Sequence, residues 1–272
     1  SKYKFTKKGW GDALYIKQKS VININKHILV AITTYNELDI TDKCIKQLKK
    51  TNNIDIILID DFSEKDNIKL LSQKYNVPCI GKIEHNGLTN SWNIAYKYFI
   101  ENDYDILYIS NNDVIIPEQT IDYMTNKIYN SDCVIVVPSS TMDGAGKGCC
   151  KKLQGISNIP NCDINIEDNT QAQNVQNHLI ENNVYKDSKV DYFTGFFFGL
   201  KKEIKQYEFS KNVLFNPKNI NLCNEIDLYT RINEINNNKI LHVKNAFIYH
   251  YKGLTIDIKK RDNLKNLENK YN

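Results

Sequence analysis

Apolar runs alternate with amphipathic stretches across residues 26–138, and this alternation most constrains how the chain can fold. The apolar runs cover residues 27–33, 54–59, 77–83, 106–109 and 133–137. Between them, residues 39–50, 65–75 and 90–101 carry apolar side chains at a spacing of three to four, which predicts helices that cover a sheet. The sequence therefore predicts an α/β fold with a Rossmann-like, mostly parallel central sheet flanked by helices.

Polar residues follow four of the predicted strands. These loops are Thr33-Thr34-Tyr35-Asn36-Glu37, Asp60-Asp61-Phe62-Ser63, Glu84-His85-Asn86-Gly87 and Asn111-Asn112-Asp113. Loops are often polar because exposed backbone and helix ends need capping side chains. Polar loops at one strand end after another nevertheless favour a binding edge, since ligands of open α/β sheets lie outside the carboxyl ends of the strands.

The rest of the chain is expected to complete one domain spanning residues 1–272. Residues 26–138 would form a nucleotide-binding half, and residues 139–189, rich in Asn, Gln, Asp and Gly, a long variable loop region. Residues 190–256 would form a smaller C-terminal lobe on the acceptor side, followed by a tail over residues 257–272. This lobe opens with an aromatic run at residues 192–200, expected to be a core strand, and continues with a helix near 224–236 and a strand at 239–249.

Composition excludes several classes of protein. A net charge of +4 with scattered lysines does not indicate a nucleic-acid ligand. Seven cysteines cannot all pair within one chain, which favours reduced thiols in the cytoplasm or an equivalent compartment. No apolar run reaches the roughly eighteen residues of a membrane helix, so we expect a soluble protein. Abundant Asn, Lys and Ile indicate an AT-rich bacterial, protist or large viral genome, and nothing indicates the oligomeric state.

Several residues could carry chemistry, each with an ordinary structural alternative. Asp113 ends a predicted strand and, with a substrate diphosphate, could hold Mg²⁺ or Mn²⁺, although Asn and Asp before Pro117 also make an ordinary turn. Glu225 and Asp227 begin a predicted helix, where the helix dipole alone explains acidic residues. His250 ends the last predicted strand.

The order of these motifs resembles that of family 2 glycosyltransferases with the GT-A fold. The resemblance covers residues 28–255 apart from the long middle loop. The matching segments are Thr34-Tyr35-Asn36 for the first strand, Asp60-Asp61-Phe62-Ser63 for Asp-Asp-x-Ser, His85-Asn86-Gly87 with Asn90 and Asn93, Asn111-Asn112-Asp113 for Asp-x-Asp, Glu225-Ile226-Asp227-Leu228 with Arg231, and Tyr249-His250. Asn111 replaces the usual first Asp of the metal motif, and Glu225 replaces the commoner Asp of the base.

The resemblance implies an inverting enzyme that moves a sugar from a nucleotide-sugar donor to a glycan, glycoprotein or other hydroxyl acceptor. Glu225 would be the general base, and Asp113 with His250 would bind Mn²⁺ or Mg²⁺. Thr194, Gly195, Asp227 and Arg231 would lie on the acceptor side. The donor-binding residues would be Thr33, Thr34, Tyr35, Glu37, Asp60, Asp61, Asn86, Gly87, Asn90, Asn93, Asn111, Asn112 and Asp113. A UDP-sugar such as UDP-GlcNAc is favoured as donor, with dTDP-rhamnose as the alternative.

Two other functions remain open at this point. A nucleotide-sugar-binding protein with weak or no catalysis would be consistent with the reduced metal motif. A nucleotidyltransferase would need a Gly-rich, basic loop after the first strand, which residues 33–37 do not supply. Residues 144–148 lack the glycine spacing of a phosphate-binding loop, and the cysteines at 149, 150 and 162 lack a zinc-site pattern.

Overall fold

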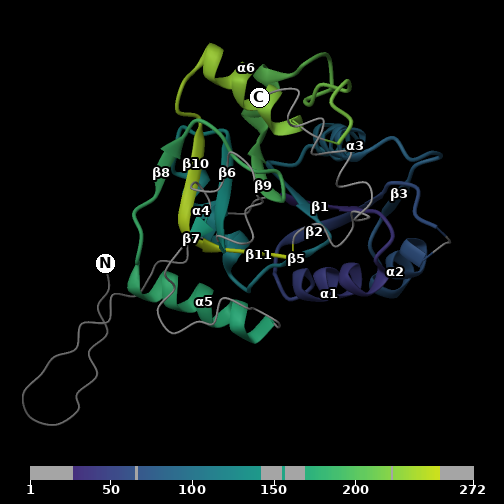
Figure 1. Cartoon of the computed structure of the whole chain (residues 1–272), viewed down its shortest axis with the longest axis horizontal. Helices are drawn as coiled ribbons and strands as arrows, with labels where there is room; N and C mark the ends of the chain where they lie inside the picture. Colours follow the sequence, from purple (N-terminus) through teal and green to yellow (C-terminus); the bar gives the residue numbers. More distant parts are fainter. Residues whose placement is uncertain (1–26, 65–66, 142–154, 157–168, 222, 252–272) are drawn as a thin grey trace, which may run out of the picture.

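Strands from both halves of the chain join one mixed sheet of nine strands. The computed structural model describes residues 27–64, 67–141, 155–156, 169–221 and 223–251 (Figure 1). The sheet strands are β1 (Ile28–Thr34), β2 (Ile54–Asp60), β3 (Cys79–Gly81), β4 (Ile106–Asn111), β6 (Ile135–Thr141), β7 (Gly155–Ile156), β8 (Ser188–Val190), β9 (Phe197–Lys201) and β10 (Ile240–Phe247). Their order is β3-β2-β1-β4-β9-β6-β10-β8, with β7 beside β6.

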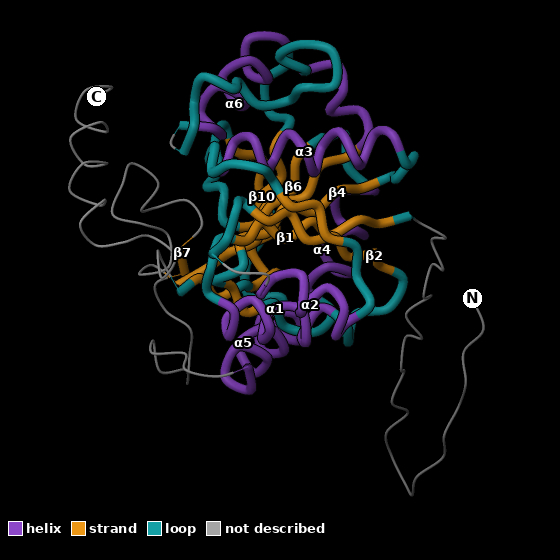
Figure 2. Tube along the Cα trace, turned by 90° about the vertical axis from the view of Figure 1, so that its right-hand side faces the viewer, coloured by secondary structure: helices purple, strands orange, loops and turns teal. Residues whose placement is uncertain are grey.

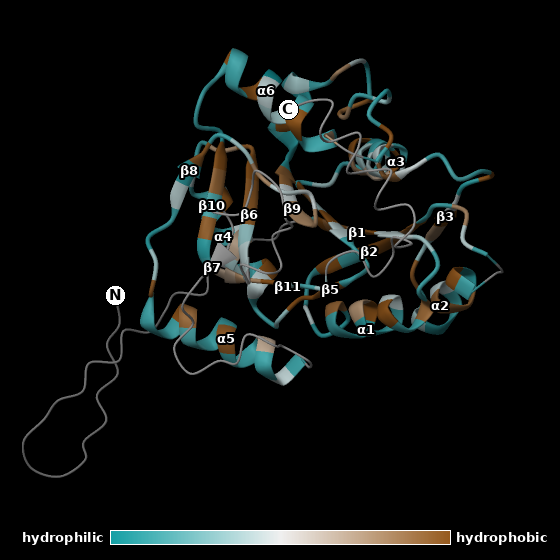
Figure 3. Ribbon diagram, viewed as in Figure 1, coloured by the Kyte–Doolittle hydropathy of each residue, from teal (hydrophilic) through white to brown (hydrophobic). Residues whose placement is uncertain are grey.

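Helices cover both faces of this sheet. They are α1 (Leu38–Leu48), α2 (Asn67–Tyr75), α3 (Leu88–Glu101), α4 (Thr120–Tyr129), α5 (Asn169–Asn182), the 3₁₀ helix η2 (Lys202–Tyr207) and α6 (Asn224–Ile235). One apolar core joins α1, α2 and α4 to one face, and a second joins α3, η2 and α6 to the other. Figure 2 shows α1 and α2 on one side of the strands and α3 and α6 on the opposite side. Hydrophobic residues run along β6, β9 and β10 between these layers (Figure 3).

The parallel strands β3, β2, β1 and β4 place their carboxyl ends on one edge. In this register Thr34 of β1 lies opposite Asp60 of β2, and Thr33 lies opposite Asn111 of β4. The acidic loops after β2 and β4 therefore flank the end of β1. This arrangement confirms the predicted α/β sheet and brings together loops that are about fifty residues apart in the sequence.

The C-terminal strands extend the same sheet. Strand β9 lies antiparallel between β4 and β6, and β10 pairs parallel with β6. A separate small sheet joins β5 (Val114–Ile115) to β11 (Tyr249–His250). The C-terminal lobe expected from the sequence thus shares its strands with the nucleotide half.

The expected loop at residues 139–189 is in part regular structure, which corrects the prediction. It contains the end of β6, β7, the 14-residue helix α5 and the start of β8. Helix α5 was missed because its surface is rich in Asn and Gln, while Ala172, Val175, Gln176 and Leu179 form its buried stripe. Strand β3 covers only residues 79–81 of the predicted 77–83, and it begins directly after Pro78, which has no N–H for the ladder. Residues 142–154 and 157–168, with the Gly-rich run and the cysteines at 149, 150 and 162, lie outside the described residues, as does the tail.

Among the described residues, no helix combines the length and apolar character needed to cross a bilayer.

Candidate active site

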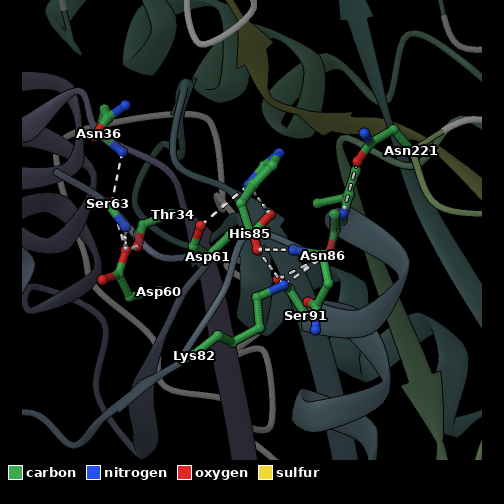
Figure 4. Close-up of polar contacts among 12 residues, drawn as sticks. Thr34, Asn36, Asp60, Asp61, Ser63, Lys82, His85, Asn86, Ser91 and Asn221 are labelled. Carbon is green, nitrogen blue, oxygen red and sulfur yellow. Dashed lines mark hydrogen bonds and ion pairs between the residues drawn. The ribbon is translucent and has the colours of Figure 1, made fainter.

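Asp60 connects the loops that follow β1 and β2. Ser63 Oγ donates to Asp60 Oδ1 at 2.5 Å and accepts a hydrogen bond from the backbone N–H of Asn36 at 2.7 Å. Thr34 Oγ1 lies 3.4 Å from the same carboxylate oxygen (Figure 4). The Asp-x-x-Ser spacing thus closes a turn that holds both loops at the edge of the sheet.

Asp61 is the buried centre of a polar cluster. Only 6% of Asp61 is exposed, and its carboxylate forms an ion pair with Lys82 and lies 3.0 Å from His85 Nδ1. Asn86 N–H also donates to Asp61 Oδ1 at 3.3 Å (Figure 4). Burial lowers the pKa of Lys82, opposed by its hydrogen bond to Asp61. The Tyr35 ring packs 4.5 Å from the His85 ring, so the cluster joins a charged pair to two aromatic rings.

The segment from Gly87 to Asn93 is anchored to the chain that precedes α6. Leu88 N–H donates to Asn221 Oδ1 at 2.9 Å, and Thr89 N–H donates to the Ile220 carbonyl at 3.1 Å. The Asn93 side-chain amide accepts hydrogen bonds from the N–H groups of Leu214 and Phe215 and donates one to the Phe215 carbonyl. The first amides of α3 are therefore engaged by protein, and the nucleotide half is connected directly to the segment that leads into α6.

Asp113 and His250 meet across the small β5–β11 sheet. His250 pairs with Val114, Tyr251 N–H donates to the Asp113 carbonyl at 3.0 Å, and His250 Nε2 lies 3.2 Å from Asp113 Oδ1. Asp113 is 1% exposed, and the Phe196 ring stacks on the His250 ring at 5.0 Å and 13°. Residues 137 positions apart thus form one polar pair.

Asp113 and His250 are suited to supply part of the ligand set of a divalent cation. A carboxylate and an imidazole are cation ligands, and the buried Asn111 Oδ1 has no hydrogen-bond partner among the described residues. Within that same part of the chain, no group of three or more His, Cys, Asp and Glu could hold a metal. Substrate and solvent oxygens would therefore have to supply the other ligands. Asn112 instead donates to Thr41 Oγ1 at 2.9 Å and fixes the turn against α1.

Glu225 lies in the first turn of α6 and is partly buried. This burial raises the pKa of the carboxyl group. Its own backbone N–H and that of Gly195 donate to the carboxylate and act in the opposite direction. A carboxyl group with a raised pKa is suited to accept a proton near neutral pH.

The dipeptide Gly195-Phe196 joins this carboxylate to the Asp113–His250 pair. Gly195 N–H donates to Glu225, whereas the Phe196 ring stacks on His250. The Phe196 carbonyl also accepts the backbone N–H of Asn111 at 2.9 Å. Two adjacent residues before β9 therefore contact both chemical groups.

Arg231 connects α6 to the backbone of residues 207 and 214. Its guanidinium donates twice to Asp227 Oδ2, at 2.8 and 2.9 Å, and to the carbonyls of Tyr207 and Leu214. Asn216 Nδ2 lies 3.4 Å from the other Asp227 oxygen. These contacts hold the helix in position, and the expected acceptor role of Asp227 and Arg231 stays a prediction.

The remaining predicted donor residues differ in their placement. Thr33 is buried, with its hydroxyl bonded to the Ser110 carbonyl at 3.2 Å. Glu37 is exposed at the start of α1, and Asn90 is partly buried in the first turn of α3. Sequence reasoning missed Lys82, although a single basic residue beyond a strand end, among acidic loops, was a usable signal.

The mixed sheet, with acidic loops at the ends of β2 and β4, has the GT-A fold of nucleotide-sugar-dependent transferases. The sequence profile described as Glycosyl transferase family 2 matches residues 29–207, about two thirds of the chain. The chain therefore belongs to glycosyl transferase family 2, as its motifs predicted. The matched region ends before Glu225 and His250. A comparison with curated proteins found no significant match.

Solved structures support the fold. A mannosyltransferase from Pyrobaculum calidifontis in complex with GDP-Man and Mn²⁺ aligns with a TM-score of 0.56 and 10% identity, over 83% of this chain and 56% of that one. GalNAc-T7 with UDP, GalNAc and Mn²⁺ gives 0.59 and 15%, over 83% and 44%. Glucosyl-3-phosphoglycerate synthase from Mycobacterium tuberculosis gives 0.53 and 11%, over 87% and 75%. The aligned part spans about half of the first two chains.

Proposed function

We propose that the protein is an inverting glycosyltransferase that moves a sugar from a nucleoside-diphosphate sugar to a hydroxyl group of a glycan or similar acceptor. The observation that carries this proposal is the Gly195-Phe196 dipeptide, which contacts the Glu225 carboxylate on one side and His250 and Asn111 on the other. Such a displacement requires a general base for the acceptor hydroxyl and a site that stabilises the departing diphosphate.

In the proposed reaction, the acceptor oxygen attacks the anomeric carbon on the face opposite the diphosphate. The acceptor proton passes to the Glu225 carboxylate as the new C–O bond forms. The bond from the anomeric carbon to the diphosphate oxygen breaks, and its electron pair leaves with the nucleoside diphosphate. A single displacement of this kind inverts the anomeric configuration. The raised pKa of Glu225 supports its assignment as the base.

Asp113 and His250 would hold Mn²⁺ or Mg²⁺ beside the diphosphate. The cation supplies positive charge that stabilises the leaving group. Asn111 lies two residues before Asp113, and because its Oδ1 has no hydrogen-bond partner among the described residues, it supports a ligand-facing role. Phe196 stacks on His250 and holds the imidazole plane in place.

The nucleoside would lie at the Asp60–Asp61 edge. A carboxylate accepts a hydrogen bond from the ring N–H of uracil, thymine or guanine, whereas adenine and cytosine offer a ring acceptor at that position. Lys82 and His85 surround the Asp61 carboxylate, and Tyr35 adds an aromatic face. A UDP-sugar is the favoured donor, with dTDP- and GDP-sugars as the alternatives to be tested.

Binding and turnover with a defined donor panel test this function. The panel is UDP-GlcNAc, UDP-glucose, dTDP-rhamnose and GDP-mannose with Mn²⁺, and the readouts are the shift in melting temperature and the release of nucleoside diphosphate. No shift and no release with any donor would contradict the proposal.

Glu225→Gln tests the base directly. With the active donor, it should lower kcat by about 10²–10⁴-fold while donor binding is retained, because the amide keeps the shape but cannot accept the proton. Glu234→Gln, at an exposed position of the same helix, is the matched control. A folded Glu225→Gln protein with kcat within about threefold of wild type would exclude Glu225 as the base.

A further inference from the structure

Gly195 has no room for a side chain. A Cβ atom built at this position would overlap Cη2 of Trp92 and lie 3.0 Å from Cζ2 of the same indole. Trp92 belongs to α3, on the face of the sheet that also carries α6. The backbone at Gly195 is therefore in direct contact with the indole ring.

Trp92 itself cannot easily move away. It is 1% exposed, and its ring packs edge-on against Phe198 at 5.2 Å and obliquely against Phe215 at 5.0 Å. The next residue, Asn93, bonds to the backbone of residues 214–215 and holds Phe215 in place. The indole is thus enclosed by rigid neighbours, so a side chain at position 195 would displace the Gly195 backbone instead.

The same glycine donates its N–H to the Glu225 carboxylate. Gly195 therefore lies between an immobile indole and the proposed base. We infer that Gly195 is a positioning residue, which Trp92 holds in place so that its backbone N–H fixes the Glu225 carboxylate for proton transfer. This inference rests on the proposed function, and it assigns to Gly195 and Trp92 a role other than acceptor contact.

The Trp92 indole can be replaced without the loss of a described hydrogen bond. Its Nε1 is buried with no hydrogen-bond partner in the described part of the chain, so packing alone orients the ring. Trp92→Phe removes the ring atoms that face Gly195 and breaks no hydrogen bond described for the indole. Trp92→Phe should therefore relieve the overlap that Gly195→Ala creates.

Carbon-13 NMR of the glutamate side-chain carboxyl groups tests the positioning without any substrate. The Glu225 signal is identified by its loss in Glu225→Gln, and its pKa is followed in wild type, Gly195→Ala, Trp92→Phe and the double variant. The N–H of Gly195 favours the charged carboxylate, so its displacement should raise the pKa of Glu225 further in Gly195→Ala. The double variant should return toward wild type. Gly81→Ala is the matched control, because nothing lies within 4 Å of its added methyl group.

Kinetics with the active donor give the second readout. Gly195→Ala should lower kcat by about 100-fold with little change in the donor KM, and the double variant should recover at least about tenfold. The acid limb of kcat/KM should move to higher pH in Gly195→Ala. If that variant does not fold, Trp92→Phe alone should move the limb in the same direction, because it frees the Gly195 backbone.

The results separate this inference from the proposed function. An inactive Glu225→Gln with an unchanged Glu225 pKa and acid limb in folded Gly195→Ala and Trp92→Phe would overturn the positioning role alone. A double variant no better than the sum of its single variants would overturn the role of Trp92. An active Glu225→Gln would overturn the proposed base and, with it, this inference.

Discussion

His242 makes the fold sensitive to acid, and His242→Gln should remove that sensitivity. The imidazole on β10 is 4% exposed, and its Nε2 lies 2.9 Å from Ser139 Oγ. The Ser139 hydroxyl donates to the Lys244 carbonyl at 3.1 Å, so it can accept a hydrogen bond from a neutral His242. Burial, aided by the charge of Lys244, lowers the pKa of His242 to about 4.

The magnitude follows from proton linkage. The unfolded chain takes up a proton at this histidine near pH 6.5, whereas the folded protein does so only near pH 4. The stabilisation is therefore complete above pH 6.5 and is lost as the pH falls through this window. Integration gives losses of about 1 kcal/mol at pH 5.5 and about 2–3 kcal/mol at pH 4.5. The limit at lower pH is about 3 kcal/mol.

Urea unfolding of wild type and His242→Gln at pH 7.5, 6.5, 5.5 and 4.5 measures this contribution. Gln can still donate to Ser139, so any loss caused by its shape should be the same at every pH. Other titrating groups cancel in the difference between the two proteins. The free energy of unfolding of wild type, minus that of His242→Gln, should fall by about 2–3 kcal/mol between pH 7.5 and 4.5. A constant difference would refute the reasoning.

Three further outcomes are expected. Asp113→Asn should lower the Mn²⁺-dependent turnover about 100-fold, because one charged ligand is lost, while exposed Asp191→Asn stays near wild type; equal activities would contradict the metal assignment. Gly87→Ala should cost about 3 kcal/mol in urea unfolding, because Gly87 has φ 86° and ψ 172° and a Cβ there would lie 2.7 Å from the Ile220 carbonyl; an unchanged midpoint would contradict this. The acid limb of the wild-type pH–rate profile should lie above pH 4.5, because activity is lost as Glu225 is protonated through its raised pKa; a limb at or below pH 4.5 would contradict the base assignment.

Local pattern was sufficient to predict most of the nucleotide-binding half. The helix predicted at 90–101 is α3 (Leu88–Glu101), and the strand predicted at 54–59 is β2 (Ile54–Asp60). Their periodicity is strong because one face of each helix and both faces of each central strand are buried. The position of the polar loops on one edge was also predictable, because right-handed crossovers place the ends of parallel strands on the same edge.

Weakly periodic elements could not be predicted in this way. Helix α5 is anchored by Gln176, a buried polar residue that bonds to Thr120, Asn245 and Phe247. Its stability depends on partners 56 to 71 residues away, which no local window contains. The antiparallel insertion of β9 between β4 and β6 likewise depends on pairing across the fold.

The sequence by itself determined the class of fold, the family motifs and the residue types that can bind a diphosphate or accept a proton. Only the tertiary structure decided which of these residues act together. Lys82 pairs with Asp61, His250 meets Asp113, and the Gly195 backbone lies between Trp92 and Glu225. The physical reason is that these contacts join side chains and backbone from separate elements, so they exist only after the sheet and its helices have packed.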